Sequence, residues 1–72
     1  MSNRLELFDI VALTDNLPEQ GLQRGQVGTV VEILAPDVYE VEFSDDEGRT
    51  YAMQALGASQ LMALHYHLFQ AA

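Results

Sequence analysis

The sequence lacks cysteine and tryptophan over its 72 residues. Without cysteine the chain cannot form disulfide bonds, thiolate zinc sites or a cysteine nucleophile. A domain of this length buries only about 60% of the surface that its unfolded chain exposes, so its margin of stability is small. Because disulfides are excluded, a homo-oligomer or a different partner subunit is the common reinforcement that remains.

Basic residues are scarce, since three arginines stand against 11 acidic residues and give a formal net charge of −8. Nucleic-acid binding draws most of its affinity from Lys and Arg contacts to phosphates, and anionic membrane surfaces attract the same side chains. The composition therefore argues against a nucleic-acid or membrane partner and favours a cationic one. Solubility alone is the other explanation of this charge.

Long apolar runs are also missing from the sequence. No segment approaches the ~20 residues that a membrane-spanning helix needs. Residues 1–6 lack the apolar stretch of a signal peptide. Together with the absence of cysteine, these features predict a cytoplasmic location.

What the chain does contain is a series of short β-type patterns. In the clearest of them, Tyr39, Val41 and Phe43 alternate with acidic residues. The acidic residues are Glu40 and Glu42, which predicts one buried and one solvated face. The strands predicted in this way cover residues 9–14, 26–34, 38–44, 49–53 and 61–66.

Two glycines three positions apart, Gly25 and Gly28, open the second predicted strand. Glycine tolerates positive φ and lets another backbone approach closely, so we expect this strand to bend as it starts. Both faces of the strand carry apolar residues. Either the bend lets both faces serve the core in turn, which we favour, or Val30 and Leu34 form a partly exposed contact patch.

The connections between the predicted strands differ in length. Residues 15–25 form a long loop in which Leu17 and Leu22 are apolar anchors, so the loop is either a binding loop or a closed, self-packed connection. Residues 55–60 are expected to form a short turn or a single 3₁₀ turn. A helix over residues 52–64 is the competing interpretation. Residues 5–8 are expected to cover one end of the core with Leu5, Leu7 and Phe8.

Five short strands with one long loop and tight hairpins are typical of a small all-β barrel. Residues 25–32 (GQVGTVVE) in this setting resemble the KOW and SH3-like barrels of ribosomal and transcription-elongation proteins. A closer similarity, to a family of small bacterial and often cyanobacterial proteins called domain of unknown function 4926, rests on several segments together. These are LFDIVAL (7–13), LPE (17–19), GL (21–22), RGQVGTVVE (24–32), YEVEF (39–43) and GRTYA (48–52).

The resemblance implies a five-stranded, partly open SH3-like (KOW-like) barrel. The single domain would span residues 1–72, with its core at about 7–66, a short N-terminal arm and a C-terminal tail. The resemblance brings no catalytic residues. A place of such proteins beside toxin-like genes suggests an antitoxin or immunity role. RNA-binding relatives are usually basic, so this acidic chain departs from them.

Three patterns resemble chemical sites without meeting their requirements. The acidic turn 45–48 is too short to wrap a calcium ion. His65 and His67 lack further zinc ligands. Glu40 and Glu42 share a solvated strand face rather than a cleft that would separate their pKa values. We therefore expect no catalytic residue, no metal, no cofactor and no enzyme activity.

The two central arginines, Arg24 and Arg49, are interpreted as local ion-pair residues with Glu32, Glu42 or Asp46, or as contacts to a partner carboxylate. Tyr51 and Tyr66 add aromatic contact area, since tyrosine is enriched at interfaces. The predicted partner-binding residues are Leu17, Leu22, Arg24, Glu40, Glu42, Arg49 and Tyr51.

The first function hypothesis is a non-catalytic protein–protein interaction module, such as an antitoxin, immunity protein or accessory subunit, whose partner is another protein of cationic character. The alternative is a self-assembling homo-oligomer, motivated by the apolar segments 26–34 and 61–66. A KOW-like nucleic-acid-associated protein is disfavoured because the chain offers no basic patch.

Overall fold

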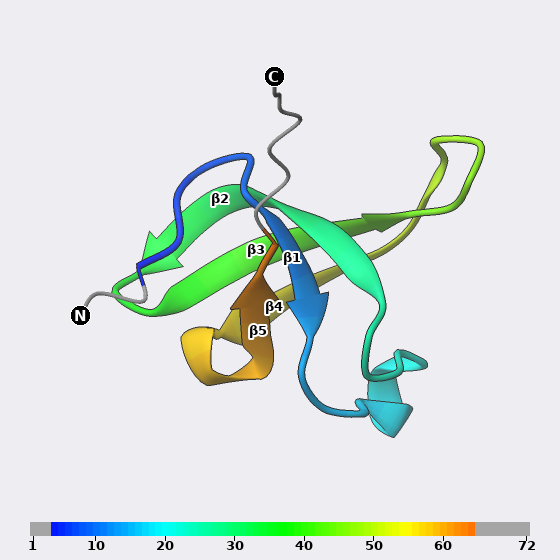
Figure 1. Ribbon diagram of the computed structural model, residues 1–72, viewed down its shortest axis with the longest axis horizontal. Helices are drawn as coiled ribbons and strands as arrows, with labels where there is room; N and C mark the ends of the chain where they lie inside the picture. Colours follow the sequence, from blue (N-terminus) through cyan, green and yellow to red (C-terminus); the bar gives the residue numbers. More distant parts are fainter. Residues whose placement is uncertain (1–3, 65–72) are drawn as a thin grey trace, which may run out of the picture.

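The computed structural model describes residues 4–64, which form one antiparallel sheet and two short 3₁₀ helices (Figure 1). The sheet order is β4-β3-β2-β1-β5, and the sheet curves around its core without joining β4 to β5. This confirms the predicted all-β, five-stranded, partly open architecture. The elements are β1 (Ile10–Leu13), η1 (Pro18–Gln20), β2 (Val27–Ala35), β3 (Val38–Ser44), β4 (Thr50–Gly57), η2 (Ala58–Gln60) and β5 (Leu61–Ala63).

The fourth strand is longer than its sequence pattern indicates. β3 and β4 pair along their whole lengths, from Ser44 opposite Thr50 to Val38 opposite Gly57. This pairing extends β4 through residues 55–57, which were predicted to be a turn, and it makes the competing helix over 52–64 wrong. The reversal is confined to η2. β5 begins at Leu61 as predicted, and its predicted end at residue 66 lies outside the described residues.

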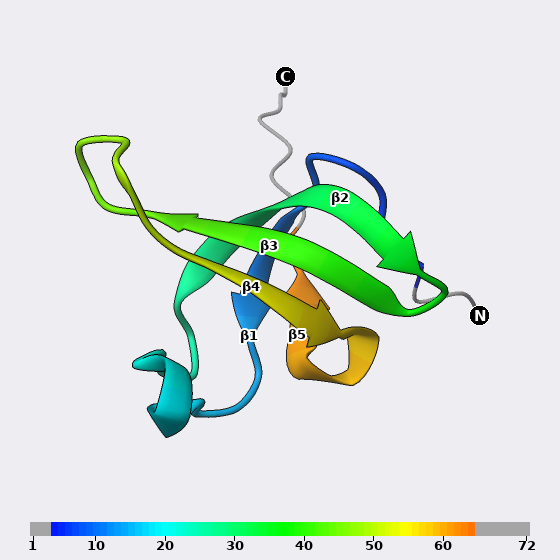
Figure 2. The same cartoon turned by 180° about the vertical axis from the view of Figure 1, so that it is seen from behind.

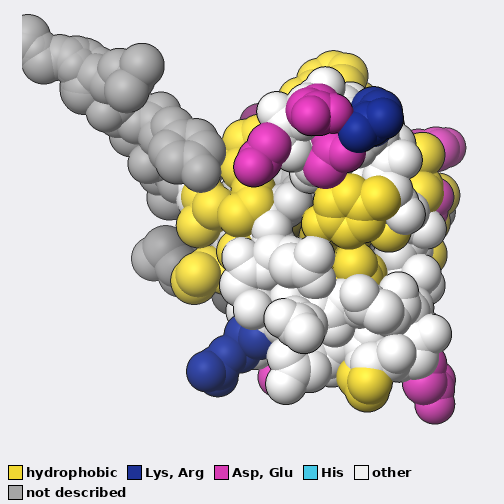
Figure 3. Space-filling model, turned by 90° about the vertical axis from the view of Figure 1, so that its right-hand side faces the viewer, with side chains coloured by type: hydrophobic (Ala, Val, Ile, Leu, Met, Phe, Trp, Pro, Cys, Tyr) yellow, Lys and Arg dark blue, Asp and Glu magenta, His cyan; other side chains and the backbone are white. Residues whose placement is uncertain are grey.

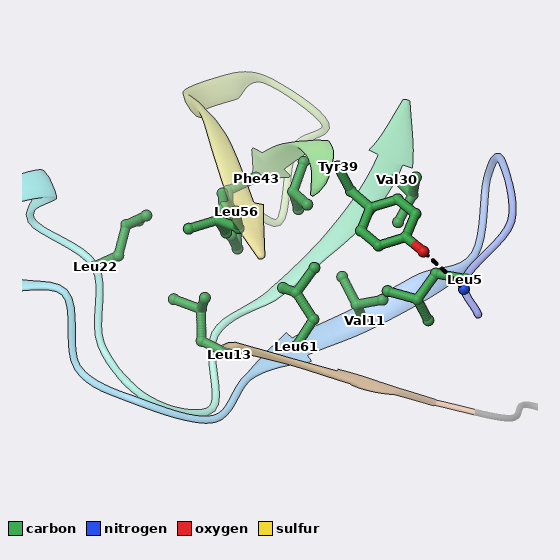
Figure 4. Packing of buried hydrophobic residues seen from close by; sticks show 10 residues of the cluster. Leu5, Val11, Leu13, Leu22, Val30, Tyr39, Phe43, Leu56 and Leu61 are labelled. Atoms are coloured by element: carbon green, nitrogen blue, oxygen red, sulfur yellow. Dashed lines mark hydrogen bonds between the residues drawn. The ribbon is translucent and has the colours of Figure 1, made fainter. Parts of the chain in front are cut away.

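The buried core lies on the concave side of the sheet and joins all five strands with the N-terminal arm (Figure 4). The predicted alternation of β3 is confirmed, because Tyr39, Val41 and Phe43 are at most 2% exposed. The N-terminal arm was expected to cover the core, and this is correct only for Leu5. The core residues are Leu5, Val11, Leu13, Leu22, Val30, Tyr39, Val41, Phe43, Leu56 and Leu61.

Leu7 and Phe8 were expected to cover the core, but they are 49% and 70% exposed. Phe8 occupies a turn with φ of 71°, and its N–H donates to the carbonyl of Val30 at 2.7 Å. The chain therefore reverses before β1, and it is Leu5 that reaches the core.

The second strand bends through irregular pairing with β3. Val30 lies opposite Val41 and Glu32 lies opposite Glu40, so Val31 is an extra residue in β2. Such a bulge bends the strand and shifts the alternation of its faces by one residue. The predicted bend is confirmed, but the expectation that both faces of the strand serve the core in turn is wrong. Val30 is fully buried, whereas Ile33 and Leu34 beyond the bulge are 49% and 46% exposed.

The two glycines at the start of β2 have the expected roles. Gly25 has a φ of 92°, and its N–H donates to the Leu13 carbonyl at 2.8 Å. Gly28 lies beside β3, paired with Phe43, and an added Cβ would be 2.7 Å from Cγ1 of Val41 and 2.9 Å from Cδ1 of Phe43. The same Cβ would lie 2.8 Å from the backbone oxygen of Glu42. Because that oxygen belongs to a paired strand, it has little freedom to withdraw.

The side chain of Tyr39 ties the N-terminal arm to the sheet. Its hydroxyl oxygen accepts a hydrogen bond from the backbone N–H of Leu5, with 3.2 Å between nitrogen and oxygen and 34 residues between the partners (Figure 4). Both residues are buried. A buried N–H requires such a partner, because leaving it unsatisfied costs about 1–3 kcal/mol.

We predict that Gly28→Ala lowers the free energy of unfolding by about 1–3 kcal/mol, because the new methyl group overpacks the contact with β3. Gly57→Ala is the matched control, since a Cβ there comes no closer than 3.7 Å to its neighbours. Chemical denaturation followed by circular dichroism measures both variants. Equal stability of Gly28→Ala and wild type would contradict the close contact between β2 and β3 at Gly28.

We also predict that Tyr39→Phe lowers the free energy of unfolding by about 1–3 kcal/mol, because the Leu5 N–H loses its acceptor. Tyr51→Phe removes an exposed hydroxyl and is expected to change stability by less than about 0.5 kcal/mol. Amide hydrogen exchange adds a local readout. Exchange at Leu5 should accelerate in Tyr39→Phe and stay unchanged in Tyr51→Phe.

Candidate functional site

Three glutamates share the convex, solvent-facing side of the sheet, where β2, β3 and β4 lie side by side (Figure 2). Residues that pair directly across neighbouring strands project from the same face. Glu40 pairs with Glu32 of β2, and Glu42 pairs with Met53 of β4. We call the surface formed by Glu32, Glu40 and Glu42 the acidic face.

The bulge at Val31 places Glu32 on the acidic face. Uninterrupted alternation would put Glu32 on the same side as Val30, which points into the core. The extra residue shifts Glu32 to the side of Glu40, and the two glutamates become a directly opposed pair. Directly opposed like charges destabilise a sheet. Within residues 4–64, neither glutamate forms an ion pair.

Glu42 is held by its neighbour in β4. The hydroxyl of Thr50 donates a hydrogen bond to the Oε2 atom of Glu42. Met53, which lies directly opposite Glu42 in β4, is 51% exposed. The acidic face is thus bordered by accessible apolar surface, a combination that suits a protein interface better than a solvated strand alone.

The β3–β4 hairpin uses its acidic residues to close the turn. The Oδ1 atom of Asp45 accepts hydrogen bonds from the backbone N–H groups of Glu47 and Arg49, both at 2.9 Å. Gly48 has a φ of 85° at the end of this turn. Figure 3 shows acidic side chains gathered beside a basic one over this hairpin. The carboxylate of Asp45 therefore serves the turn itself.

Arg49 forms its ion pairs within the same turn. Its Nε lies 3.5 Å from Oδ2 of Asp45, and its Nη2 lies 2.6 Å from Oε1 of Glu47. The predicted local ion pair is present, but its partners are not Glu42 or Asp46. The tight turn brings the flanking carboxylates closer to the guanidinium than any carboxylate of the strands. Because both pairs are exposed, their contribution to stability is small.

The long loop is closed on itself. Leu17 and Leu22 exchange two backbone hydrogen bonds, at 2.8 and 3.0 Å. Leu22 is 2% exposed and Leu17 packs against the core, so both side chains contribute to the packing of the fold. Arg24 is exposed, and its backbone N–H donates to Oδ1 of Asn16 at 2.9 Å. Among the described residues its side chain forms none of the predicted ion pairs.

Tyr51 lies at one end of the core rather than on the acidic face. Its ring centroid is 6.4 Å from that of Phe43, and its hydroxyl accepts a hydrogen bond from Nε2 of Gln26 at 2.8 Å. With 49% exposure it remains accessible. The seven predicted residues therefore fall into separate regions, and the acidic face unites only Glu40 and Glu42.

Sequence reasoning missed Glu32, a member of the acidic face, and Met53, which borders it. Glu32 could not be assigned to it because the bulge that redirects it has no distinct residue signature. Met53 had a usable signal, since it stands in the strand opposite the alternating Glu40 and Glu42 and carries no charge.

A hollow of about 520 Å³ lies where the N-terminal arm meets the β2–β3 turn. Its charged lining residues are Arg4 and Asp37, and no serine, histidine or cysteine among residues 4–64 lines it. The remaining lining residues in this part of the chain are Leu5, Ile33, Leu34, Ala35, Pro36 and Tyr39. The described lining therefore shows no nucleophile next to a base.

Residues 4–64 contain neither a cluster of metal-ligating side chains nor a helix that could cross a membrane. No group of three His, Cys, Asp or Glu side chains in this part is placed to hold a metal ion. None of the helices there has the length and apolar character to cross a membrane. His65, Tyr66 and His67 lie outside the described residues, so the interpretations attached to them stay predictions.

The curved, incompletely closed antiparallel sheet defines the chain as a small, partly open β-barrel protein. The family model named Domain of unknown function (DUF4926) matches residues 7–63. The chain belongs to this family, as its sequence motifs implied. Neither a curated protein nor a solved structure matches it.

We predict that Asp45→Ala lowers the free energy of unfolding by about 1 kcal/mol, because two backbone N–H groups lose an acceptor. For a domain of this size the loss corresponds to a decrease in melting temperature of about 4–8 °C. Asp46→Ala removes the same charge from the adjacent position and should leave the melting temperature nearly unchanged. Equal decreases in the two variants would show that charge, rather than turn closure, is responsible.

Proposed function

We propose that this chain is a non-catalytic protein–protein interaction module that binds a cationic protein through its acidic face. The observation that carries the proposal is the direct opposition of Glu32 and Glu40 on a solvent-facing surface. This arrangement costs stability in the isolated chain. A basic partner converts the same repulsion into attraction, which is how complementary interfaces gain specificity and speed of association.

The surroundings of the acidic face support a protein as the partner. Met53 and Ala55 are exposed next to Glu42 and Glu40. Protein interfaces combine an apolar core with a polar rim. A nucleic acid is disfavoured by the net charge of −8. An antitoxin, an immunity protein or an accessory subunit in the cytoplasm would each use such a surface, and occlusion of a basic partner would be the mechanism.

We predict that the triple variant Glu32→Gln, Glu40→Gln, Glu42→Gln binds this partner roughly tenfold more weakly at the same salt concentration. The control variant Asp15→Asn, Glu19→Gln, Asp46→Asn removes the same number of charges from exposed positions away from the acidic face. Affinity capture from a lysate of the native host, with mass spectrometry at low and high salt, compares the two variants with wild type.

The expected result is one basic protein recovered by wild type and control, lost by the acidic-face variant and released by high salt. Binding that persists in the acidic-face variant would overturn the proposed surface. Recovery of nucleic acid in place of a protein would overturn the proposed partner class. The thermal stability of the acidic-face variant should not fall below wild type, since the opposed like charges are gone.

A further inference from the structure

β4 is an edge strand without the usual protection against pairing. It is eight residues long, contains no charged residue and no proline, and exposes Tyr51 and Met53 by about half. Edge strands of soluble proteins are normally short, charged, interrupted or covered. β5, at the other edge of the sheet, is short, with three residues. Only the pairing irregularity between Phe43 and Ser44, which leaves Tyr51 as an extra residue, interrupts β4.

The backbone of β4 directs hydrogen-bonding groups away from β3. In β2, the N–H of Val30 bonds to the carbonyl of Asp9, toward β1. In antiparallel strands the backbone N–H and C=O groups of successive residues point to alternate sides. Val41 lies opposite Val30 but does not bond to it, so its N–H and C=O groups point toward β4 and meet those of Gln54. The neighbours of Gln54 in β4, Met53 and Ala55, therefore direct their N–H and C=O groups outward. No described residue accepts or donates there.

We propose that β4 pairs antiparallel with β4 of a second copy of this chain, across a two-fold axis at Gln54. This register joins the outward groups of Met53 to those of Ala55 in the second copy. It also places each large side chain opposite a small one, which the sequence of β4 permits around this centre. The pairs are Met53 with Ala55, Leu56 with Ala52, and Tyr51 with Gly57.

The net charge of each copy does not oppose this contact. The nearest acidic residues on the sheet, Glu42 of one copy and Glu40 of the other, are separated by the two uncharged β4 strands. Three strand spacings place them about 14 Å apart. This exceeds the screening length of about 8 Å at physiological ionic strength. An uncharged edge is therefore the part of this acidic chain that a second copy can approach.

The self-pairing can be tested apart from the proposed partner surface, although Met53 and Ala55 border both. Gln54 pairs with Val41 and lies on the concave side of the sheet, whereas Glu42 and Glu40 lie on the convex side. A variant at Gln54 therefore tests self-pairing without altering the acidic face. Loss of partner binding in the acidic-face variant leaves the self-pairing intact, so the two proposals fail separately.

Cysteine cross-linking tests the register, because the chain contains no natural cysteine. At the two-fold axis the two copies of residue 54 form a non-hydrogen-bonded pair with Cα atoms about 4.5 Å apart. That separation lies within the range of disulfides. Diamide oxidation of Gln54→Cys should give a covalent dimer on a non-reducing gel at low micromolar concentration. Gln20→Cys, exposed in η1, should remain monomeric, and equal cross-linking of both would overturn the register.

Charges introduced at residue 54 test the association itself, which sedimentation measures over a range of protein concentrations. Wild type and Gln20→Lys should form dimers with the same dissociation constant. Gln54→Lys and Gln54→Glu should each dissociate at least about tenfold more readily, because like charges face each other at the axis. An equimolar mixture of the two should restore dimers. A monomeric wild type, or a mixture no more associated than either variant alone, would overturn the proposal, with folding of each variant verified by circular dichroism.

Discussion

At Gly28, β2 packs so closely beside β3 that a single methyl group would contact Val41, the Glu42 carbonyl and Phe43 within 2.9 Å. Gly28 belongs to a row of paired residues that, among residues 4–64, spans the sheet from edge to edge. The row contains Ala63, Val11, Gly28, Phe43 and Ala52, one from each strand. Because the central member has no side chain, the sheet can curve tightly enough for the residues of its outer strands to reach a common core.

The same strand that makes the curvature also makes the candidate site. Beyond Gly28, the extra residue Val31 shifts the alternation of β2, so that Glu32 leaves the core side and faces Glu40. The opposed carboxylates weaken a domain whose small core leaves little stability to spare. Folding does not explain their position on an accessible face, and this is why we propose that the face recognises a basic surface. The bulge leaves Val30 in the core while it turns Glu32 to solvent, so one strand contributes to both the core and the acidic face.

Much of the fold could be predicted because its elements have recognisable residue patterns in the sequence. The alternation around Val41 in β3, the glycines at the start of β2 and the acidic hairpin were each predicted from their residues, and the family followed from the same segments. The full length of β4 was not predictable, because residues 55–57 owe their strand conformation to pairing with β3 rather than to their own propensity. The bulge at Val31 has no local signature, so Glu32 was missing from the candidate site. The partners of Arg49 depended on turn geometry that composition does not reveal.

The uneven lengths of the connections have a kinetic consequence. β2, β3 and β4 follow one another through a two-residue turn and a short hairpin, so their contacts require only small loops to close. β1 and β5, in contrast, meet only after nearly the whole chain has been enclosed between them. Since closing a large loop costs more entropy before its contacts form, the three-strand meander is expected to form first. During that interval the uncharged side of β4 already faces solvent while the core is still incomplete. Refolding at high protein concentration would therefore favour association of half-formed chains over completion of the monomer.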